Sequence, residues 1–450
     1  MKKSRFIKRL LISIGFLLFL AFFLIKKVNP RPFKEESYYT ETLQALDSCL
    51  AGLDTSKKIV FAGWSKKNIT PKSPVRIVGY GLQDDFKTVN DSIHVRTTVF
   101  AQGKKKYALI SYDLLFIHPN ITLNLEKSLT RQNVQLDGIY YTATHTHNSF
   151  GGWGFDRYFD DLLLDGEENH IMDLIINQSV ESIKEAITRL DTTLISTGSF
   201  NFKDFIRNRI PDEEFLDPWI HTLQLIHPTK GDTSLITTFS AHATCLFSIM
   251  DENILSGDYP GMMSSVYEST NKKQFTFCAG GVASFSPRNT KSAIPETQEY
   301  AMKMLLPLLD SISTKQSSIV TSLQFFKSKL KMPEPIFRIS ENYQLKPWLF
   351  KQTIGFIEPE IAFLRIGTSI FIGFPGEISG ELYQDEIQRS KEKNVSLIVT
   401  SLNGNYTGYA MPEDYYHEKT CHELRDMNWF GPQSGNYFKT LIQEIVNHIN

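Results

Sequence analysis

Residues 138–147 read Gly-Ile-Tyr-Tyr-Thr-Ala-Thr-His-Thr-His, a β-rich run that ends in two histidines. Aromatic and β-branched residues favour a strand over Gly138–Thr142. That strand places His145 and His147 just beyond its carboxyl end. Their i, i+2 spacing would put both side chains on one side of an extended chain, whereas a turn would let them diverge. The stretch therefore predicts a strand whose end carries two imidazoles.

Further β-rich runs alternate with helical patterns along the rest of the chain. Val95–Ala101 and Tyr107–Tyr112 predict a hairpin. The other predicted strands are Leu223–Ile226, Leu235–Ser240, Gln274–Cys278, Ile361–Ile366, Ser369–Phe374 and Leu397–Thr400. The predicted helices are Ile121–Gln132, Ile171–Leu190, Pro295–Ser311, Ser379–Lys391 and Tyr437–Ile449. This interleaving predicts an α/β fold with a mixed β-sheet core and flanking helices.

Side chains that can bind a metal follow three more of these predicted strands. They are His242, Glu377 and the pair Tyr406 and Tyr409. Ligands of α/β proteins bind outside the carboxyl ends of strands, so we expect these side chains to converge. Neutral imidazole and carboxylate suit zinc, and neighbouring histidines often divide metal binding from proton transfer. Each residue alone is more often structural, so the prediction of a metal site at the strand ends depends on the whole set.

Seven short motifs occur in an order that resembles the catalytic domain of the neutral, non-lysosomal ceramidases. The motifs are Ala62–Pro71 with Gly79-Tyr80-Gly81, Ala143–His147 with Gly151-Gly152, Asn208–Pro211, His242–Thr244 leading to Ile254–Asp258, Ser286–Asn289, Pro375–Glu377 and Asn405–Tyr409. The resemblance covers most of the chain from Ala62 onward. It implies zinc-dependent hydrolysis of the N-acyl amide bond of ceramide or a related N-acylated lipid.

The same resemblance implies roles for individual residues. The zinc ligands would be His145, His242, Glu377 and Tyr409. His147 would handle protons, and Arg209 would hold or polarise the oxygen of the scissile amide. Ser286 occupies a position where a nucleophile is conceivable. We expect a supporting role for it, because water activated by zinc already supplies a nucleophile.

The sequence also departs from the family pattern. Asn148-Ser149-Phe150 stands where the family has Ser-Gly-Pro, and Ile210 stands where it has serine. Cys421 lies nearest to the place of a further family tyrosine. These departures keep open a zinc hydrolase of a non-lipid amide or ester. An inactive ceramidase-like binding protein is the alternative from another class.

The N-terminus predicts a membrane segment. Basic residues precede the uncharged run Leu10–Ile25, and Lys26 and Lys27 close it. At about 1.5 Å per residue the run is slightly shorter than a hydrocarbon core of about 30 Å. No small-x-small cleavage site follows, which favours an uncleaved anchor over a signal peptide. Either case places the catalytic domain outside the cytoplasm, in the periplasm or at the cell surface, or secreted after cleavage.

These signals predict three segments. Residues 1–28 form a membrane anchor or signal segment, residues 29–56 a juxtamembrane segment, and residues 57–450 the catalytic domain. The last segment leaves no room for the C-terminal β-sandwich domain that commonly follows in the family.

Composition narrows the class of protein. The chain has 450 residues, a formal charge of -1, 41% hydrophobic and 12% aromatic residues, as in a globular protein with a large core. The balanced charge gives no reason to expect nucleic acid as a partner. The family resemblance implies a lipid amide substrate, and the N-terminal segment predicts the membrane as a partner. The scattered cysteines exclude a cysteine-rich zinc module, and we expect most of them to be buried thiols. They are Cys49, Cys245, Cys278 and Cys421.

Overall fold

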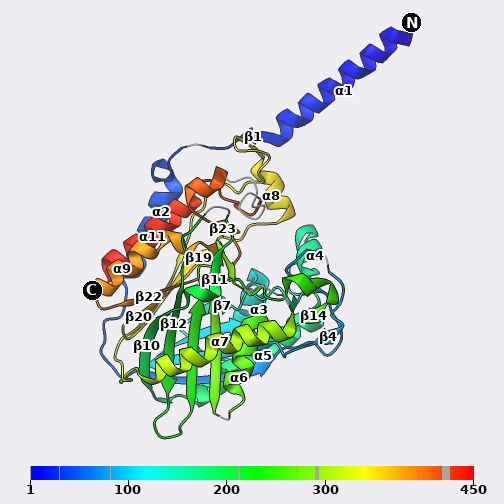
Figure 1. Ribbon diagram of the computed structural model, residues 1–450. Coiled ribbons are helices and arrows are strands. Elements are labelled where there is room, and N and C mark those ends of the chain that lie inside the picture. The colour runs from blue at the N-terminus through cyan, green and yellow to red at the C-terminus, as the bar shows by residue number, and fades with distance from the viewer. Residues whose placement is uncertain are drawn as a thin grey trace.

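Three large β-sheets, each covered by its own helices, form the body of the protein in the part of the chain that the structure describes (Figure 1). The structure is a computed structural model, and it describes residues 2–29, 31–81, 83–210, 213–270, 272–288, 293–417 and 426–449. Because the sheets share an inner core, the ends of strands from different sheets can meet at one place.

The first sheet has the strand order β7-β6-β5-β2-β9. Its strands are β2 (Phe61–Asn68), β5 (His94–Gln102), β6 (Lys105–Tyr112), β7 (Gly138–Ala143) and β9 (Asp191–Thr192). Helices α3 (Pro119–Arg131) and α5 (Asn169–Thr188) cover it. α5 turns one apolar stripe, which includes Ile171, Ile175 and Ile183, into the core of this layer.

The second and third sheets repeat this plan. The second sheet has the strand order β10-β12-β13-β15. Its strands are β10 (Leu194–Asn201), β12 (Trp219–Ile226), β13 (Thr233–Phe239) and β15 (Lys273–Ala279). Helices α6 (Asp258–Glu268) and α7 (Ile294–Ser313) pack on it. The third has the order β17-β19-β20-β22 and comprises β17 (Leu323–Lys329), β19 (Glu360–Ile366), β20 (Ser369–Gly373) and β22 (Ser396–Thr400). Its helices are α2 (Ser37–Ala51), α9 (Gln384–Glu392) and α11 (Ser434–His448). Figure 1 shows α2 and α11, from opposite ends of the chain, side by side.

A single apolar cluster draws on strands of all three sheets. It includes Tyr140 of β7, Ile236 of β13 and Phe371 of β20, each at most 1% exposed. The phenolic hydroxyl of Tyr140 forms a 2.6 Å hydrogen bond with the hydroxyl of Thr400, at the end of β22. Burial of such side chains is worth about 25 cal/mol per Å² of apolar surface, so this cluster holds the three sheets together.

Each large sheet contains one parallel pair of strands. The pairs are β6 with β7, β13 with β15, and β20 with β22. A predicted site residue follows each of β7, β13 and β20: His145 and His242 lie in the loops after β7 and β13, and Glu377 begins the short strand β21 after β20. The three-sheet architecture therefore brings together three predicted site residues, one from each sheet.

The predicted mixed α/β core with flanking helices is confirmed, and it is divided among three sheets. All nine predicted strands are present with bounds shifted by a few residues. The helix predicted over Ser379–Lys391 begins only at Gln384, because Glu377–Ile378 form the short strand β21 and Gly380–Leu382 a 3-10 turn. Helix α6 and strands β10 and β17 were not predicted.

The N-terminal helix α1 (Lys2–Leu24) projects away from the body (Figure 1). Among the described residues, one helical stretch, Phe6–Leu24, is long and apolar enough to cross a membrane, by length and composition. The short strand β1 (Ile25–Lys27) follows α1 and pairs with β18 (Tyr343–Leu345). Of the cysteines, Cys245 and Cys278 are buried and Cys49 is half-buried, whereas Cys421 lies outside the described residues.

Candidate metal centre

Three histidines lie in the loops that follow β7 and β13, and all three hold their rings in the same way. The Nδ1 atoms of His145, His147 and His242 lie 2.7, 2.8 and 2.8 Å from main-chain carbonyl oxygens. Those oxygens belong to Leu115, Gly79 and Phe285, respectively. A carbonyl oxygen only accepts hydrogen bonds, so each Nδ1 carries the proton and each Nε2 of the neutral ring keeps its lone pair. This arrangement presents imidazoles to a metal ion.

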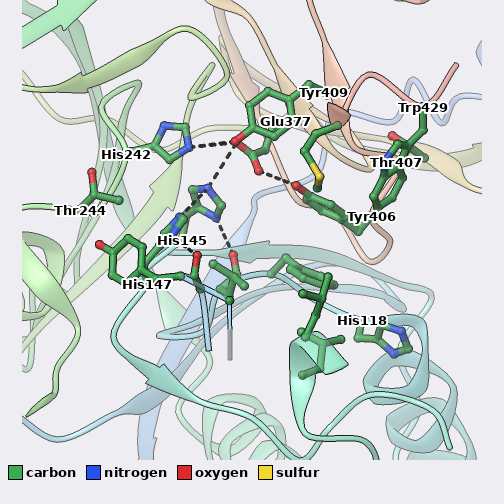
Figure 2. A pocket seen from close by; sticks show the side chains of 18 of the residues that line it. His118, His145, His147, His242, Thr244, Glu377, Tyr406, Thr407, Tyr409 and Trp429 are labelled. Atoms are coloured by element: carbon green, nitrogen blue, oxygen red, sulfur yellow. Dashed lines mark hydrogen bonds and ion pairs between the residues drawn. The ribbon is translucent and has the colours of Figure 1, made fainter. Parts of the chain in front are cut away.

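The three Nε2 atoms face a common point (Figure 2). Ligand atoms of His145, His147 and His242 all lie within 4.8 Å of one another, and Nε2 of His147 is 3.4 Å from Nε2 of His145. His145 reaches this point through a left-handed backbone conformation, φ 62°, which is unusual for a residue other than glycine and is often found at functional sites. Unprotonated nitrogens this close repel one another unless a cation lies between them.

Glu377 completes the cluster from the third sheet. Its Oε2 lies 3.0 Å from Nε2 of His242 and 3.4 Å from Nε2 of His145. This oxygen is buried and has no hydrogen-bond partner among the described residues. An orphaned carboxylate oxygen beside two imidazole lone pairs is a donor set that fits zinc.

Burial keeps the neighbouring histidines neutral. It lowers the pKa of His242 to about 4, and the positive charge of Arg209 acts in the same direction. Burial also lowers the pKa of His147 well below its ordinary value. Both rings are therefore unprotonated at Nε2 at neutral pH, which is the form that binds metal or accepts a proton.

Tyr409 and Arg209 form the side of the cluster next to His242. Tyr409 is the register partner of Glu377 in a parallel ladder between β21 (Glu377–Ile378) and β23 (Tyr409–Ala410). The Tyr409 hydroxyl lies 3.5 Å from Nε2 of His242 and accepts a 3.1 Å hydrogen bond from Nη2 of Arg209. Burial and Glu377 raise the pKa of Tyr409 well above 10, while Arg209 opposes that shift. Arg209 is itself fixed by hydrogen bonds to the carbonyl oxygen of Ala283.

Sequence reasoning missed the role of Tyr406. Its hydroxyl donates a 2.7 Å hydrogen bond to Oε1 of Glu377, and its ring stacks on Phe116 at 4.5 Å. The signal in the sequence was the spacing of Tyr406 three residues before Tyr409, which alone does not say which tyrosine contacts the carboxylate. Tyr406 therefore sets the orientation of a predicted ligand.

Ser286 lines the same cavity as the histidines but stands apart from their hydrogen bonds. It lies on β16 (Phe285–Pro287), opposite Arg207 of β11 (Ile206–Asn208). Among the described residues, no hydrogen bond joins its hydroxyl to a histidine. The supporting role expected for Ser286 therefore stays a prediction. Pro211 and Asn289, which belong to two of the sequence motifs, lie outside the described residues.

The cluster lies in a cavity of about 950 Å³ whose walls include many aromatic side chains. This volume is near the upper end of the range of about 300–1,000 Å³ for small-molecule sites. The polar residues of the cluster include His145, His147, His242 and Glu377 (Figure 2). The aromatic residues of the walls are Tyr80, Phe116, Phe155, Phe247, Phe350, Phe356, Tyr406, Tyr409, Trp429 and Phe430. A cavity of this kind can hold an apolar ligand with one polar group against the histidines.

Fold and site together define an α/β protein with a candidate metal centre of the kind that hydrolases use. The chain belongs to the neutral/alkaline non-lysosomal ceramidase family, whose N-terminal model matches residues 61–304. None of the curated protein sequences compared with the chain matches it.

Solved structures give the same fold. One is the crystal structure of neutral ceramidase from Pseudomonas aeruginosa, with a TM-score of 0.72, 18% identity, and coverage of 87% of this chain and 74% of that one. Another is described as a ceramidase complexed with C2, with a TM-score of 0.71, 16% identity, and coverage of 86% and 75%. At these identities the likeness shows a shared mixed α/β architecture, and the roles of single residues require their own evidence.

Proposed function

We propose that this protein is a zinc-dependent amidohydrolase that cleaves the N-acyl bond of ceramide or a related N-acylated lipid, releasing a fatty acid and an amine. One observation carries the proposal: unprotonated imidazoles and an orphaned carboxylate oxygen converge in an aromatic-walled cavity. Membership of the ceramidase family supports the substrate class.

The proposed zinc ligands are His145, His242, Glu377 and Tyr409. Bound zinc would polarise the acyl carbonyl and lower the pKa of a water molecule to about 7. The Tyr406 hydroxyl orients the Glu377 carboxylate, and Arg209 stabilises the phenolate form of Tyr409 through its hydrogen bond. The carbonyl oxygens that bind Nδ1 fix the orientation of His145 and His242.

His147, Arg209 and Ser286 are the proposed catalytic residues around these ligands. Nδ1 of His147 donates its proton in a hydrogen bond to the Gly79 carbonyl oxygen. Nε2 can therefore take a second proton and pass it to the leaving amine nitrogen. Arg209 keeps a fixed positive charge beside Tyr409, where it can stabilise negative charge on the amide oxygen. Ser286 lies within the cavity and can hydrogen-bond the substrate.

The geometry also supports a second assignment of the ligands, in which His147 is the third histidine ligand. Nε2 of His147 belongs to the same convergent group as the Nε2 atoms of His145 and His242, whereas the Tyr409 hydroxyl is 3.5 Å from His242. A centre with three histidine ligands would leave Glu377 or Tyr409 to handle the proton. Metal content of a His147 variant separates the two assignments, because a ligand loses metal when it is replaced and a proton carrier does not.

Apolar walls favour a lipid over a small polar amide. Aromatic and aliphatic side chains line much of the cavity beside the cluster, and such a wall can hold an acyl chain. Helix α1 supports a location at a membrane, with residues 1–28 as anchor and the catalytic domain outside the cytoplasm, in the periplasm or at the cell surface. An inactive binding protein would have no need of the orphaned carboxylate oxygen beside the histidines.

Metal content and amide hydrolysis test the proposal together. The full chain would be purified in detergent, its zinc measured, and its hydrolysis of a fluorescent N-acyl sphingosine followed with and without chelator. We expect about one zinc per chain and release of fatty acid that chelator abolishes. Zinc without ceramide turnover would redirect the search to other amides or esters, and a chain without zinc or turnover would refute the proposal.

A further inference from the structure

The N-terminal helix is joined to the body by a strand rather than by a loose linker. β1 follows α1 directly and pairs antiparallel with β18, with Ile25 opposite Leu345. Two further main-chain hydrogen bonds extend the pairing, from Lys346 to the Leu24 carbonyl at 2.7 Å and from Val28 to the Asn342 carbonyl at 3.0 Å. Strand addition of this kind fixes direction as well as position. The end of α1 is therefore held at one place on the surface.

Side chains reinforce this junction. The ring of Phe23 lies 6.4 Å from the ring of Trp348, edge to face, and Nζ of Lys346 lies 5.5 Å from the ring of Phe22. Trp348 belongs to α8 (Pro347–Thr353), which follows β18 directly. Tryptophan and lysine are the residues that gather at the boundary between hydrocarbon and water. The beginning of α8 thus contacts the last turn of the apolar helix.

The segment that contacts α1 also forms part of the cavity wall. Phe350 of α8 and the following residues Ile354, Phe356 and Ile357 line the cavity. Figure 1 shows α8 beside the point where α1 leaves the body. One short segment, residues 346–357, therefore contacts the end of the apolar helix and forms part of the cavity wall.

Exposed apolar side chains gather on this segment and on the hairpin before it. They are Ile339, 51% exposed, Tyr343, 45%, Trp348, 42%, and Phe356, 39%. Lys27 and Lys351, both exposed, stand among them. Large apolar side chains grouped on a surface mark an interaction site, and lysines among them suit lipid head groups.

We propose that these residues, Ile339, Tyr343, Trp348 and Phe356, form a membrane-docking surface that holds the cavity opening against the lipid bilayer. The occupant is the bilayer surface, because the surface is continuous with the helix that would enter the bilayer. The inference rests on the anchoring role proposed for α1 and is independent of zinc and of amide chemistry. Its consequence is that a lipid substrate would pass from the leaflet to the cavity along residues 346–357.

Tryptophan fluorescence tests the docking surface without any activity measurement. The chain has five tryptophans. Trp64, Trp153 and Trp429 are at most 5% exposed and Trp219 is half-buried, which leaves Trp348 as the largely exposed one. The full chain would be reconstituted into phosphatidylcholine–phosphatidylglycerol vesicles with lipids brominated near the head group. We expect the brominated lipids to quench the wild type, and Trp348→Phe to remove that quenching. Equal quenching of both proteins, or none of either, would overturn the proposal.

Hydrolysis at a membrane provides an independent test. Trp348→Glu should lower hydrolysis of vesicle-embedded ceramide by roughly tenfold, equivalent to about 1.4 kcal/mol of docking energy, and leave hydrolysis of a water-soluble short-chain amide unchanged. Leu306→Glu is the matched control, because Leu306 is 53% exposed on α7, far from α1 in Figure 1. Unchanged vesicle hydrolysis by Trp348→Glu would contradict docking. If the wild type hydrolyses neither substrate, the proposed function fails, and the quenching result alone decides the docking surface.

Discussion

The hydroxyl of Tyr406 donates to Oε1 of Glu377 across 2.7 Å and thereby determines which carboxylate oxygen faces the histidines. Oε2, the oxygen left without a hydrogen-bond partner among the described residues, lies 3.0 Å from Nε2 of His242. The Tyr406 ring is held in turn by stacking on Phe116. The orientation of a proposed metal ligand therefore depends on a residue that has no direct contact with the metal in the proposed centre.

Tyr406→Phe should weaken zinc binding while the fold persists. The substitution keeps the ring that stacks on Phe116 and removes only the donor to Glu377. Loss of such an outer partner typically costs about 10–100-fold in metal affinity, which a competition titration with a zinc chelator would measure. Tyr112→Phe is the control, since it also removes a buried hydroxyl bond, 2.9 Å to Ser179, away from the cavity. Equal zinc affinity in Tyr406→Phe and wild type would refute this role.

Replacing the histidines one at a time should separate metal binding from proton transfer. His145→Ala and His242→Ala each remove an Nε2 atom that lies within 3.4 Å of Glu377, so both should lose zinc and hydrolysis together. His147→Ala should retain zinc and lower kcat by about 10²–10⁴-fold, the range typical of a lost general acid–base group. Zinc content by elemental analysis and kcat on the same samples provide the measurement. Loss of zinc from His147→Ala would assign His147 as a ligand.

The strands and the residues at their ends could be predicted because both are local properties of the sequence. β-Branched and aromatic runs such as Gly138–Thr142 predict strands by composition, and His145 follows within a few residues. The order of the motifs also predicted the family, and the match of the family model over residues 61–304 confirms that prediction. The assignment of zinc ligands and catalytic residues stays a prediction that the variants above test.

The division into three sheets could not be predicted because it depends on contacts between distant residues. The hydroxyl of Tyr437 in α11 bonds Thr42 in α2, almost the whole chain away, at 2.8 Å. No local pattern encodes such a pairing, and the same holds for β1 against β18. The contact of Tyr406 with Glu377 is also a product of tertiary structure, because either Tyr406 or Tyr409 could have reached the carboxylate from sequence alone.

Gly79→Ala should lower turnover by displacing His147. A Cβ on Gly79 would lie 2.7 Å from Cα and 2.8 Å from Cβ of His147, closer than real contacts, and the Gly79 carbonyl also accepts the His147 Nδ1 proton. We expect a lower kcat with zinc retained, together with about 1–3 kcal/mol of destabilisation from crowding. Gly81→Ala is the matched control, because Gly81 also has a positive φ but nothing within 4 Å. If both variants lose the same amount of kcat, the contact with His147 is not the cause.

Arg96 pairs with two buried carboxylates. Its replacement should lower the free energy of unfolding and change how that free energy depends on pH. Nη1 lies 2.7 Å from Asp113 and Nε lies 3.1 Å from Glu268, with all three side chains at most 4% exposed. Arg96→Met leaves the buried Asp113 without its guanidinium partner and leaves Glu268 with Lys66 alone. Breaking a buried ion pair by removing one partner typically costs about 3–5 kcal/mol in the free energy of unfolding. Lys303→Met is the control, since its ion pair with Glu299 is largely exposed and contributes about 0–1 kcal/mol.

The pH dependence follows from the pKa of Glu268. Burial raises this pKa, but Arg96 and Lys66 more than offset that effect and hold it below the ordinary value of 4.5. A pKa lower in the folded than in the unfolded chain stabilises the fold above pH 4.5, and this stabilisation is lost as the pH falls through the folded value. In Arg96→Met, only Lys66 still opposes the effect of burial, so the pKa of Glu268 should rise and protonation of Glu268 should relieve part of the damage. Urea unfolding from pH 7 to pH 4 should therefore show the deficit of the variant relative to wild type shrinking as the pH falls, and a constant deficit would contradict the assignment.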